Sequence, residues 1–130
     1  MYILIVGGGT MGRCIAAALP EHEITIIEKN ADKCFRIKAE LKVNVIEGDA
    51  SKLYILKRAD FQRANAVIAV SNNDDVNLFV SLLALKNSKK TVARVHEPEY
   101  IPLFNELGIT SIISPEQRAA MDIAKKIVWE

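Results

Sequence analysis

The chain has 130 residues and a mass of 14.4 kDa, half of its residues are apolar, and 17 Lys and Arg stand against 16 Asp and Glu. This length suits one domain with a single core and excludes a two-domain enzyme. The first 65 residues carry ten basic and eight acidic side chains, and the last 65 carry seven and eight. No basic face is therefore expected that could hold a nucleic acid.

The two cysteines, Cys14 and Cys34, fall in separate helical segments without the spacing of a metal site. They indicate buried, reduced thiols of an intracellular protein. No apolar run approaches the roughly 18–20 residues that span a bilayer, and Met1 opens directly into a strand-like run without a charged region before it. The sequence predicts neither membrane insertion nor a secretory signal, so any membrane role comes through a partner.

Six short apolar runs predict strands at residues 2–6, 24–27, 43–46, 66–70, 91–95 and 111–113. The first and fourth runs, YILIV and AVIAV, are continuously apolar, which is typical of central strands covered on both faces. Helices are predicted between and after them, at 10–19, 31–41, 51–58, 73–87, 98–107 and 115–129. The pattern predicts an α/β fold: a doubly wound, Rossmann-like parallel sheet of six strands in the order 3-2-1-4-5-6, with helices on both faces.

Residues that cap or interrupt helices support these boundaries. Asn30 is expected to cap the second helix and Gly108 to end the fifth. Ser114 and Gln117 have the spacing of a capping box at the start of the last helix. Pro102 lies inside the fifth helix and predicts a kink or a short 3₁₀ lead-in there.

A glycine-rich segment, IVGGGTMGR, joins the first strand to the first helix. Gly7 permits the tight turn, Gly9 lets the backbone approach a pyrophosphate, and Gly12 lets the helix pack closely on the sheet. Free N–H groups at the start of the helix face the anion. An acid, Glu28, follows sixteen residues after Gly12 at the end of the next strand, where it would accept hydrogen bonds from a ribose. These features together predict an adenine-nucleotide site, with a structural glycine turn as the alternative.

Glu28 also bears on which nucleotide binds. A carboxylate at this point repels a 2′-phosphate, so NADP is expected to bind poorly, although Lys29 beside it weakens that case. NAD, NADH, ATP and ADP all carry a free 2′-hydroxyl, and Glu28 does not distinguish among them.

Further polar residues follow the carboxyl ends of the third and fourth strands, the edge where ligands lie in such sheets. Asp49 and Ala50 could frame an adenine, with Asp49 accepting from the ring amine. Ser71 and Asn72 lie close to the expected switch point between the first and fourth strands.

Charged and metal-ligating residues elsewhere leave alternatives open. Residues Asn72 to Asp75 are interpreted as helix capping and dipole compensation. A cation site built on Asp74 and Asp75 is the less favoured alternative, and no metal site is predicted. Arg94, at the end of the fifth strand, either meets a phosphate or an inward acid or is a solvated strand end. His22 and His96 are given no role.

The last helix carries an apolar stripe that reaches Trp129, one residue from the end of the sequence. A stripe of this kind usually faces a core. A large ring so near a terminus would be exposed unless a partner subunit or a following segment covers it.

The segments YILIVGGGTMGR, ITIIEKN, NVIEGDAS, ANAVIAVSNNDDVNL, ARVHEPEY and LGITSIISPE, in this order and at these spacings, resemble the N-terminal nucleotide-binding domain of the RCK/KTN family. The resemblance covers nearly the whole chain and is greatest to members of Trk-type potassium uptake systems. It implies a domain that binds NAD(H), or ATP or ADP in some members, and that forms dimers within larger rings. It also implies a cytoplasmic regulatory subunit, peripheral to the cell membrane, that sits on an integral membrane potassium-translocating subunit and gates potassium flux.

By position, the resemblance places five residues of the glycine segment along the pyrophosphate: Gly7, Gly8, Gly9, Thr10 and Met11. It places Glu28 on the adenosine ribose, and Asp49 and Ala50 near the adenine. Ser71 and Asn72 would lie along the ligand, and Arg94 would face the phosphates. The helix from Pro115 onward resembles the one that crosses to a neighbouring protomer.

The sequence departs from the family at two points. Asp60 stands where many relatives have Gly, which Asp tolerates because it can adopt a left-handed conformation. The sequence also stops before the second, C-terminal lobe of Trk-type relatives, so either a single-lobe protein or a piece of a longer one is expected.

The rival class is an NAD-dependent oxidoreductase reduced to its cofactor domain. Neither a substrate domain nor a Tyr and Lys pair at YxxxK spacing is visible, and no catalytic residue is assigned. The sequence therefore favours a regulator over an enzyme.

Overall fold

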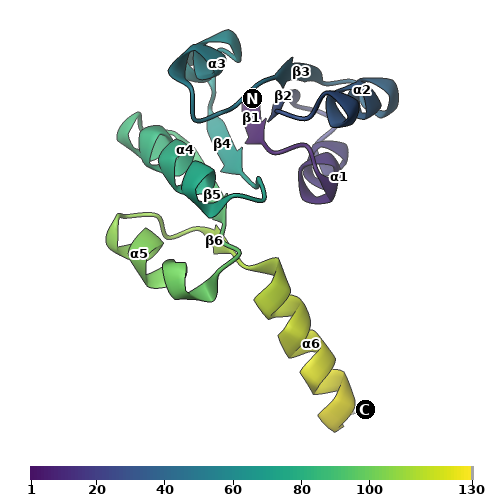
Figure 1. Cartoon of the computed structure of the whole chain (residues 1–130), viewed down its shortest axis with the longest axis vertical. Helices are drawn as coiled ribbons and strands as arrows, with labels where there is room; N and C mark the ends of the chain where they lie inside the picture. The colour runs from purple at the N-terminus through teal and green to yellow at the C-terminus, as the bar shows by residue number, and fades with distance from the viewer. Residues whose placement is uncertain (130) are drawn as a thin grey trace.

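A computed structural model describes residues 1–129 as an α/β body from which one helix projects (Figure 1). The strands are β1 (Tyr2–Val6), β2 (Glu23–Glu28), β3 (Asn44–Glu47), β4 (Ala66–Ala69), β5 (Lys90–Arg94) and β6 (Ile112–Ile113). They form one parallel sheet in the order β3-β2-β1-β4-β5-β6. The predicted fold class and strand order are confirmed.

The central strand β1 is buried along its whole length because it has a neighbour on each side and helices on both faces. Ile5 pairs with Ile26 of β2 and with Ile68 of β4. A continuously apolar sequence is what such a position requires.

Six α-helices cover the sheet or extend from it: α1 (Thr10–Ala18), α2 (Ala31–Glu40), α3 (Leu53–Arg58), α4 (Asp74–Lys86), α5 (Ile101–Glu106) and α6 (Pro115–Trp129). Leu4 faces a core shared with Val80 of α4, whereas Ile5 faces the opposite core with Ala16 of α1 and Ile37 of α2. Because alternate residues of β1 enter opposite cores, the strand fixes both helical layers.

Most element boundaries lie within two residues of the expected ones. Asn30 caps α2 by accepting a hydrogen bond from the Lys33 amide at 2.9 Å, and Gly108 follows α5 with a φ of +93°. A 3₁₀ turn (Pro98–Tyr100) precedes α5, so Pro102 lies in the first turn of the α-helix, where its missing N–H is tolerated.

Two local features follow α3. The 3₁₀ turn Phe61–Arg63 was not expected from the sequence. Asp60 precedes it in the left-handed conformation with a φ of +60°, as the departure from glycine predicted. Its carboxylate pairs with Arg63 at 2.8 Å, and Arg63 also pairs with Glu23 at 2.8 Å.

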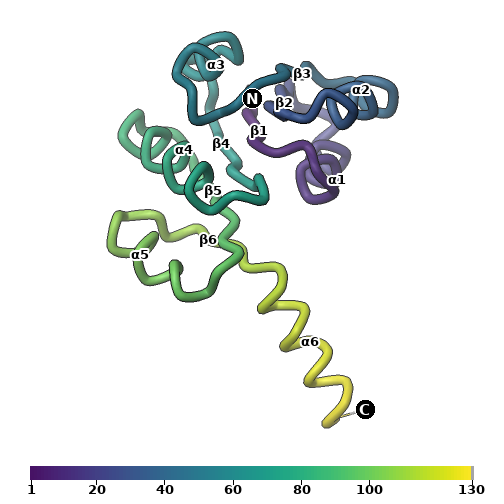
Figure 2. Tube along the Cα trace, in the orientation of Figure 1, coloured from purple at the N-terminus to yellow at the C-terminus, as the bar shows by residue number. Residues whose placement is uncertain are grey.

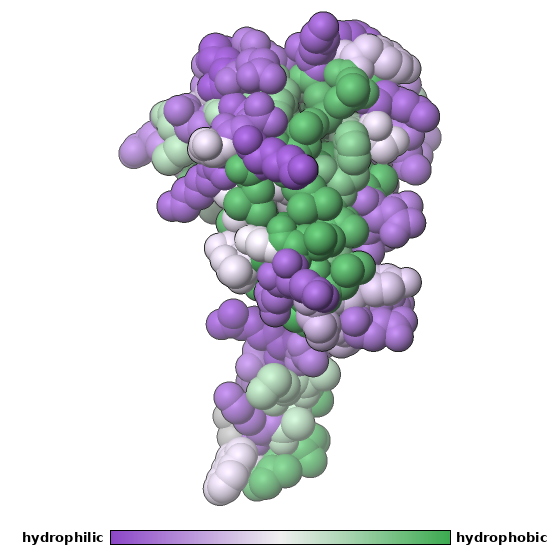
Figure 3. Space-filling view, turned by 90° about the vertical axis from the view of Figure 1, so that its left-hand side faces the viewer, coloured by the Kyte–Doolittle hydropathy of each residue, from purple (hydrophilic) through white to green (hydrophobic). Residues whose placement is uncertain are grey.

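Helix α6 points away from the body, and its end lies far from the sheet (Figure 2). None of its residues is buried, and Trp129 is 82% exposed. The space-filling view shows apolar side chains at the free end of this projection, where Ile127 and Val128 are exposed (Figure 3). No helix within residues 1–129 has the length and apolar character needed to cross a membrane.

Two expectations about single side chains are corrected. Ser114 does not close a capping box, because its buried Oγ has no hydrogen-bond partner in the described part of the chain. Cys14 is exposed on the outer side of α1, and only Cys34 is buried; its Sγ lies 3.2 Å from the Glu28 carbonyl oxygen. The apolar stripe of α1 faces the sheet through other positions, which leaves Cys14 outside it.

Candidate functional site

A cleft of about 730 Å³ opens at the carboxyl edge of the sheet, where β1 and β4 end side by side. Helices leave these two strands toward opposite faces, and their divergence creates the space. The cleft is lined by Val6, Gly7, Gly9, Thr10, Met11, Ile27, Glu28, Lys29, Asn30, Lys33, Gly48, Asp49, Ala50, Val70, Ser71, Asn72, Asn73, Val76 and Arg94.

The glycine segment forms the base of the cleft. Gly7 has a φ of +113°, and a Cβ there would lie 2.7 Å from the Ser71 amide nitrogen. A Cβ on Gly12 would collide with the carbonyl oxygen of Gly7, so the first turn of α1 can lie against the loop only without it. A Cβ on Gly9 would meet no atom of the described chain within 4 Å. Gly7 and Gly12 are therefore required by the fold, whereas Gly9 faces open space in the cleft.

The Glu28 carboxylate joins the glycine loop to the start of α2. Oε1 accepts a hydrogen bond from the Gly8 amide at 2.8 Å, and Oε2 accepts one from the Asn30 amide at 2.8 Å. The carboxylate thus holds two backbone segments of the cleft and still has acceptor capacity on both oxygens. The amide of Gly8 is used within the protein.

Two lysines, Lys29 and Lys33, line the cleft together with Glu28. Lys29 was predicted, and Lys33, in the first turn of α2, was missed. Lys33 could have been found from the predicted cap at Asn30, because the residue three positions after a capping residue lies at the same end of the helix. The two lysines add positive charge to the lining of the cleft.

Asp49 lines the cleft in the turn that follows β3. Its Oδ1 accepts hydrogen bonds from the Ser51 amide at 2.9 Å and the Ser51 hydroxyl at 2.8 Å. These bonds hold the pKa of Asp49 below its usual value of 3.8. Ala50 is buried beside it.

Ser71 is held by a buried amide that joins β4 to β5. The Asn77 side chain, which is fully buried, accepts from the Ser71 amide at 3.0 Å and from its hydroxyl at 2.8 Å. Its Nδ2 donates to the carbonyl oxygens of Ser71 and Arg94, each at 3.0 Å. The backbone on this side of the cleft is therefore fixed, while Asn72 next to it is exposed.

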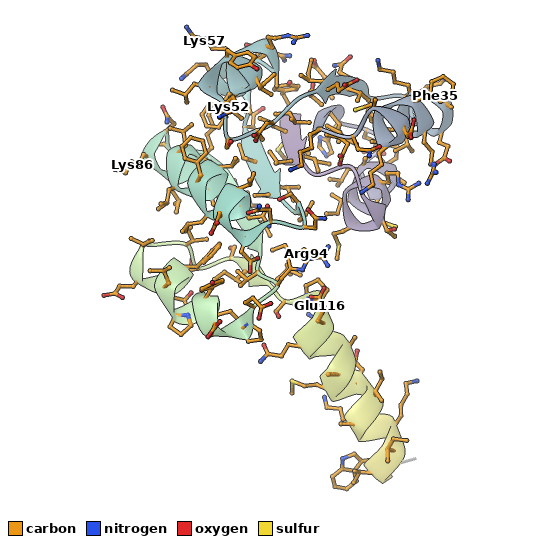
Figure 4. The ribbon with its side chains drawn as sticks, viewed as in Figure 1. Phe35, Lys52, Lys57, Lys86, Arg94 and Glu116 are labelled. Atoms are coloured by element: carbon orange, nitrogen blue, oxygen red, sulfur yellow. The ribbon has the colours of Figure 1, made fainter. Side chains whose placement is uncertain are left out.

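Arg94 enters the cleft from the end of β5, and its charge is shared with α6. Its Nη2 lies 2.7 Å from Oε1 of Glu116, which holds the pKa of that carboxyl below its usual value. Its Nε is buried without a hydrogen-bond partner among residues 1–129. Figure 4 shows the two side chains facing each other at the start of α6. Of the two readings of Arg94, the structure supports a meeting with an acid.

Asn73 and Asp74, at the start of α4, have structural uses. Asn73 caps the helix by accepting from the Val76 amide at 3.1 Å. The Asp74 carboxylate accepts from the amides of His96 and Glu97, at 2.8 and 3.0 Å, and so holds the turn after β5. The described residues contain no group of three or more His, Cys, Asp and Glu suited to a metal ion.

The structure brings eleven of the thirteen predicted site residues into the lining of one cleft. Gly8 and Gly12 do not line the cleft; the first bonds to Glu28 and the second packs beneath the loop. The remaining predicted residues line it together, although they come from five separate turns of the chain.

This cleft and fold have known counterparts. The chain is 38% identical over 133 aligned residues to a Trk system potassium uptake protein TrkA homolog of Archaeoglobus fulgidus, an alignment that covers 98% of this chain and 30% of that protein. The chain thus spans less than a third of that relative's length.

Two solved structures share the fold. The Kef C-terminal domain of Shewanella denitrificans in its AMP-bound form has a TM-score of 0.84 and 20% identity, over 100% of this chain and 83% of that one. The GsuK channel bound to NAD has a TM-score of 0.69 and 20% identity, over 88% of this chain and 21% of that one.

The family assignment rests on the sequence itself. The TrkA-N domain matches residues 3–115, which include the whole cleft, strands β2 to β6 and all of β1 except Tyr2. The resemblance to the nucleotide-binding domain of Trk-type systems is therefore confirmed, and the chain belongs to the TrkA-N domain family.

Proposed function

We propose that this domain binds an adenine nucleotide, NAD(H) or else ATP or ADP, in the cleft and thereby regulates potassium uptake. The observation that carries the proposal is the cleft at the carboxyl edge of β1 and β4. There a glycine loop at a helix N-terminus, the Glu28 carboxylate and the Arg94 guanidinium line one space.

The residues fit such a ligand in three ways. Gly9 leaves open space at the start of α1, where backbone amides favour phosphate oxygens. Glu28 keeps acceptor capacity for the ribose hydroxyls. Arg94 supplies a charge for the phosphates, and its buried Nε lacks a partner in the described chain.

Support for potassium as the transported ion comes from the relative. The Archaeoglobus protein is a potassium uptake protein, and its similarity extends over nearly all of this chain. We infer a cytoplasmic homo-oligomer, a dimer or a ring, that acts on an integral membrane potassium-translocating subunit through α6 or the body. A ligand can shift such an assembly only if it binds two arrangements with different affinities.

Thermal unfolding with NAD, NADH, NADP, ATP, ADP and no ligand tests nucleotide binding. A ligand at 100 times its Kd adds about 2.7 kcal/mol, which raises Tm by about 8–13 °C for a chain of this length. NADP is expected to give the smallest shift. The absence of a shift with every nucleotide would overturn the proposal.

A matched pair of glycine variants separates binding from folding. Gly9→Ala meets no neighbouring atom, so it should fold with an unfolding free energy within about 1 kcal/mol of the original and lose the nucleotide shift. Gly7→Ala forces a side chain into a backbone contact at positive φ and should lower Tm without any ligand. A Gly9→Ala protein that binds nucleotide as before would place the phosphates elsewhere.

Co-purification tests the membrane partner. The tagged protein, expressed together with a potassium-translocating membrane subunit, is expected to be recovered with it, and the recovered amount should change with the bound nucleotide. If the tagged protein is recovered without the membrane subunit at every nucleotide concentration, a regulatory role at the membrane is contradicted.

A further inference from the structure

The junction between β5 and α6 leaves two buried polar atoms without partners. Within residues 1–129, buried side-chain N and O atoms without hydrogen bonds are Arg94 Nε, Ser114 Oγ and Ser81 Oγ. Arg94 is one partner of the ion pair with Glu116, and Ser114 precedes Glu116 by two positions at the start of α6. A buried polar group without a hydrogen-bond partner destabilises the fold by about 1–3 kcal/mol, so this arrangement of the junction lacks hydrogen bonds that another arrangement could form.

The ion pair itself is weak. It rests on a single atom pair, Nη2 to Oε1 at 2.7 Å, and the Glu116 side chain is 54% exposed. A pair of this kind contributes up to about 1 kcal/mol. A guanidinium gains more from two parallel bonds to one phosphate, which would also give Nε a partner.

The guanidinium can move without the strand. Asn77 bonds to the Arg94 carbonyl oxygen at 3.0 Å and fixes the backbone, whereas the side chain is only partly buried. The Arg94 guanidinium can therefore exchange Glu116 for another acceptor by side-chain rotation, while its backbone stays in place.

The start of α6 has few other attachments. No residue of the helix is buried, and its N-cap side chain makes no bond. Besides Arg94, the Glu116 carboxylate meets its own backbone amide and His96, whose Nδ1 lies 3.6 Å away and whose Nε2 lies 3.2 Å from the Ser71 carbonyl oxygen. Glu116 is thus the charged link between the cleft and α6 (Figure 4).

We propose that Glu116 competes with the ligand's phosphates for Arg94, so that a phosphate-bearing ligand in the cleft releases the first turn of α6 from the sheet. The inference rests on the proposed function and assigns Glu116 as a residue that determines affinity for phosphate. Adenosine, which has no phosphate, leaves the Arg94 to Glu116 pair intact.

Binding of adenosine and of ADP to the full chain, measured by calorimetry, tests the competition. Glu116→Gln removes the competitor's charge and should tighten ADP binding up to about fivefold, the equivalent of about 1 kcal/mol, while adenosine affinity stays the same. In an Arg94→Gln background, Glu116→Gln should have no further effect on ADP, because the shared partner is gone. Asp122→Asn is the control: it removes the same charge from α6, away from the cleft.

Hydrogen exchange reports the release directly. In the original protein, ADP should speed exchange of the amides of residues 118–121 by up to about fivefold, and adenosine should not. Glu116→Gln should exchange at the faster rate without ligand.

Three results would overturn the competition. The first is an unchanged ADP affinity in Glu116→Gln, and the second is the same gain in ADP affinity in Asp122→Asn. The third is a weaker ADP affinity in Glu116→Gln, which would make Glu116 a group that positions Arg94 for phosphate. If the original protein binds neither adenosine nor ADP but binds NAD, the comparison is made with NAD, and the same outcomes decide it. If it binds no nucleotide, the proposed function falls together with this inference.

Discussion

Replacing Glu28 by Gln separates the structural use of this carboxylate from its use toward a ligand. The carboxylate accepts one backbone hydrogen bond on each oxygen, from Gly8 and from Asn30, both at 2.8 Å. Gln keeps one acceptor oxygen and brings an NH₂ group to the other amide, which then lacks an acceptor. The loss of one charge-assisted bond at a half-buried site corresponds to about 1.5–3 kcal/mol.

This free energy translates into a measurable change in melting temperature. An unfolding entropy of about 2.1 cal/mol/K per residue makes 1 kcal/mol worth about 3.7 °C in a chain of this length, so Glu28→Gln should lower Tm by about 6–11 °C without ligand. The control is Glu47→Gln, at the adjacent register position of β3, where the side chain is exposed. That change should stay within about 0.5 kcal/mol.

The assay is thermal denaturation followed by circular dichroism, with and without nucleotide. Equal Tm values for Glu28→Gln and Glu47→Gln would refute the reasoning that Glu28 holds the two loops together. Glu28→Ala should also weaken nucleotide binding at least tenfold, or about 1.4 kcal/mol. An unchanged affinity in a folded Glu28→Ala protein would mean that the ribose is held elsewhere.

Three further predictions concern other side chains. Cys14 should react with a thiol reagent in the native protein at pH 8 and Cys34 should not, because burial raises the pKa of Cys34; labelling followed by mass spectrometry decides, and equal rates would contradict it. The lowered pKa of Asp49 means that its contribution to stability is complete above about pH 4 and is lost as the pH falls through its folded-state pKa; Ser51→Ala should reduce that acid dependence in urea titrations, and identical pH profiles would argue against the bonds. Asn77→Leu should lower the unfolding free energy by at least about 2 kcal/mol, since it leaves buried backbone groups of β4 and β5 without partners; a smaller loss in urea unfolding would show that those groups find other partners.

The sequence predicted the sheet well because its signals are local. A strand such as YILIV, apolar at every position, has few places in a protein other than the centre of a parallel sheet. The glycine spacing fixes a turn between neighbouring elements, so the base of the cleft could also be located from the sequence.

The parts of the site that the sequence did not predict depend on contacts between distant segments. The sequence predicted Glu28 only as an acceptor for ribose hydroxyls. In the structure both of its carboxylate oxygens accept hydrogen bonds from backbone amides, which the spacing of the residues does not reveal. Arg94 and Glu116 are 22 positions apart, and only the return of the chain through α5 and β6 brings them together. Ser114 stands at the position of a capping residue, yet its Oγ is buried without a partner in the described chain, so packing overrides the local preference.

The free-standing position of α6 has a consequence for how the protein unfolds. A helix of 15 residues without buried side chains receives little support from tertiary packing, and isolated helices of this length are only marginally stable in water. Its helical content is therefore not set by the cooperative transition of the sheet. In the homo-oligomer proposed above, a second copy that covers α6 would stabilise it, so far-ultraviolet ellipticity should fall on dilution while the buried strands keep their full cooperativity.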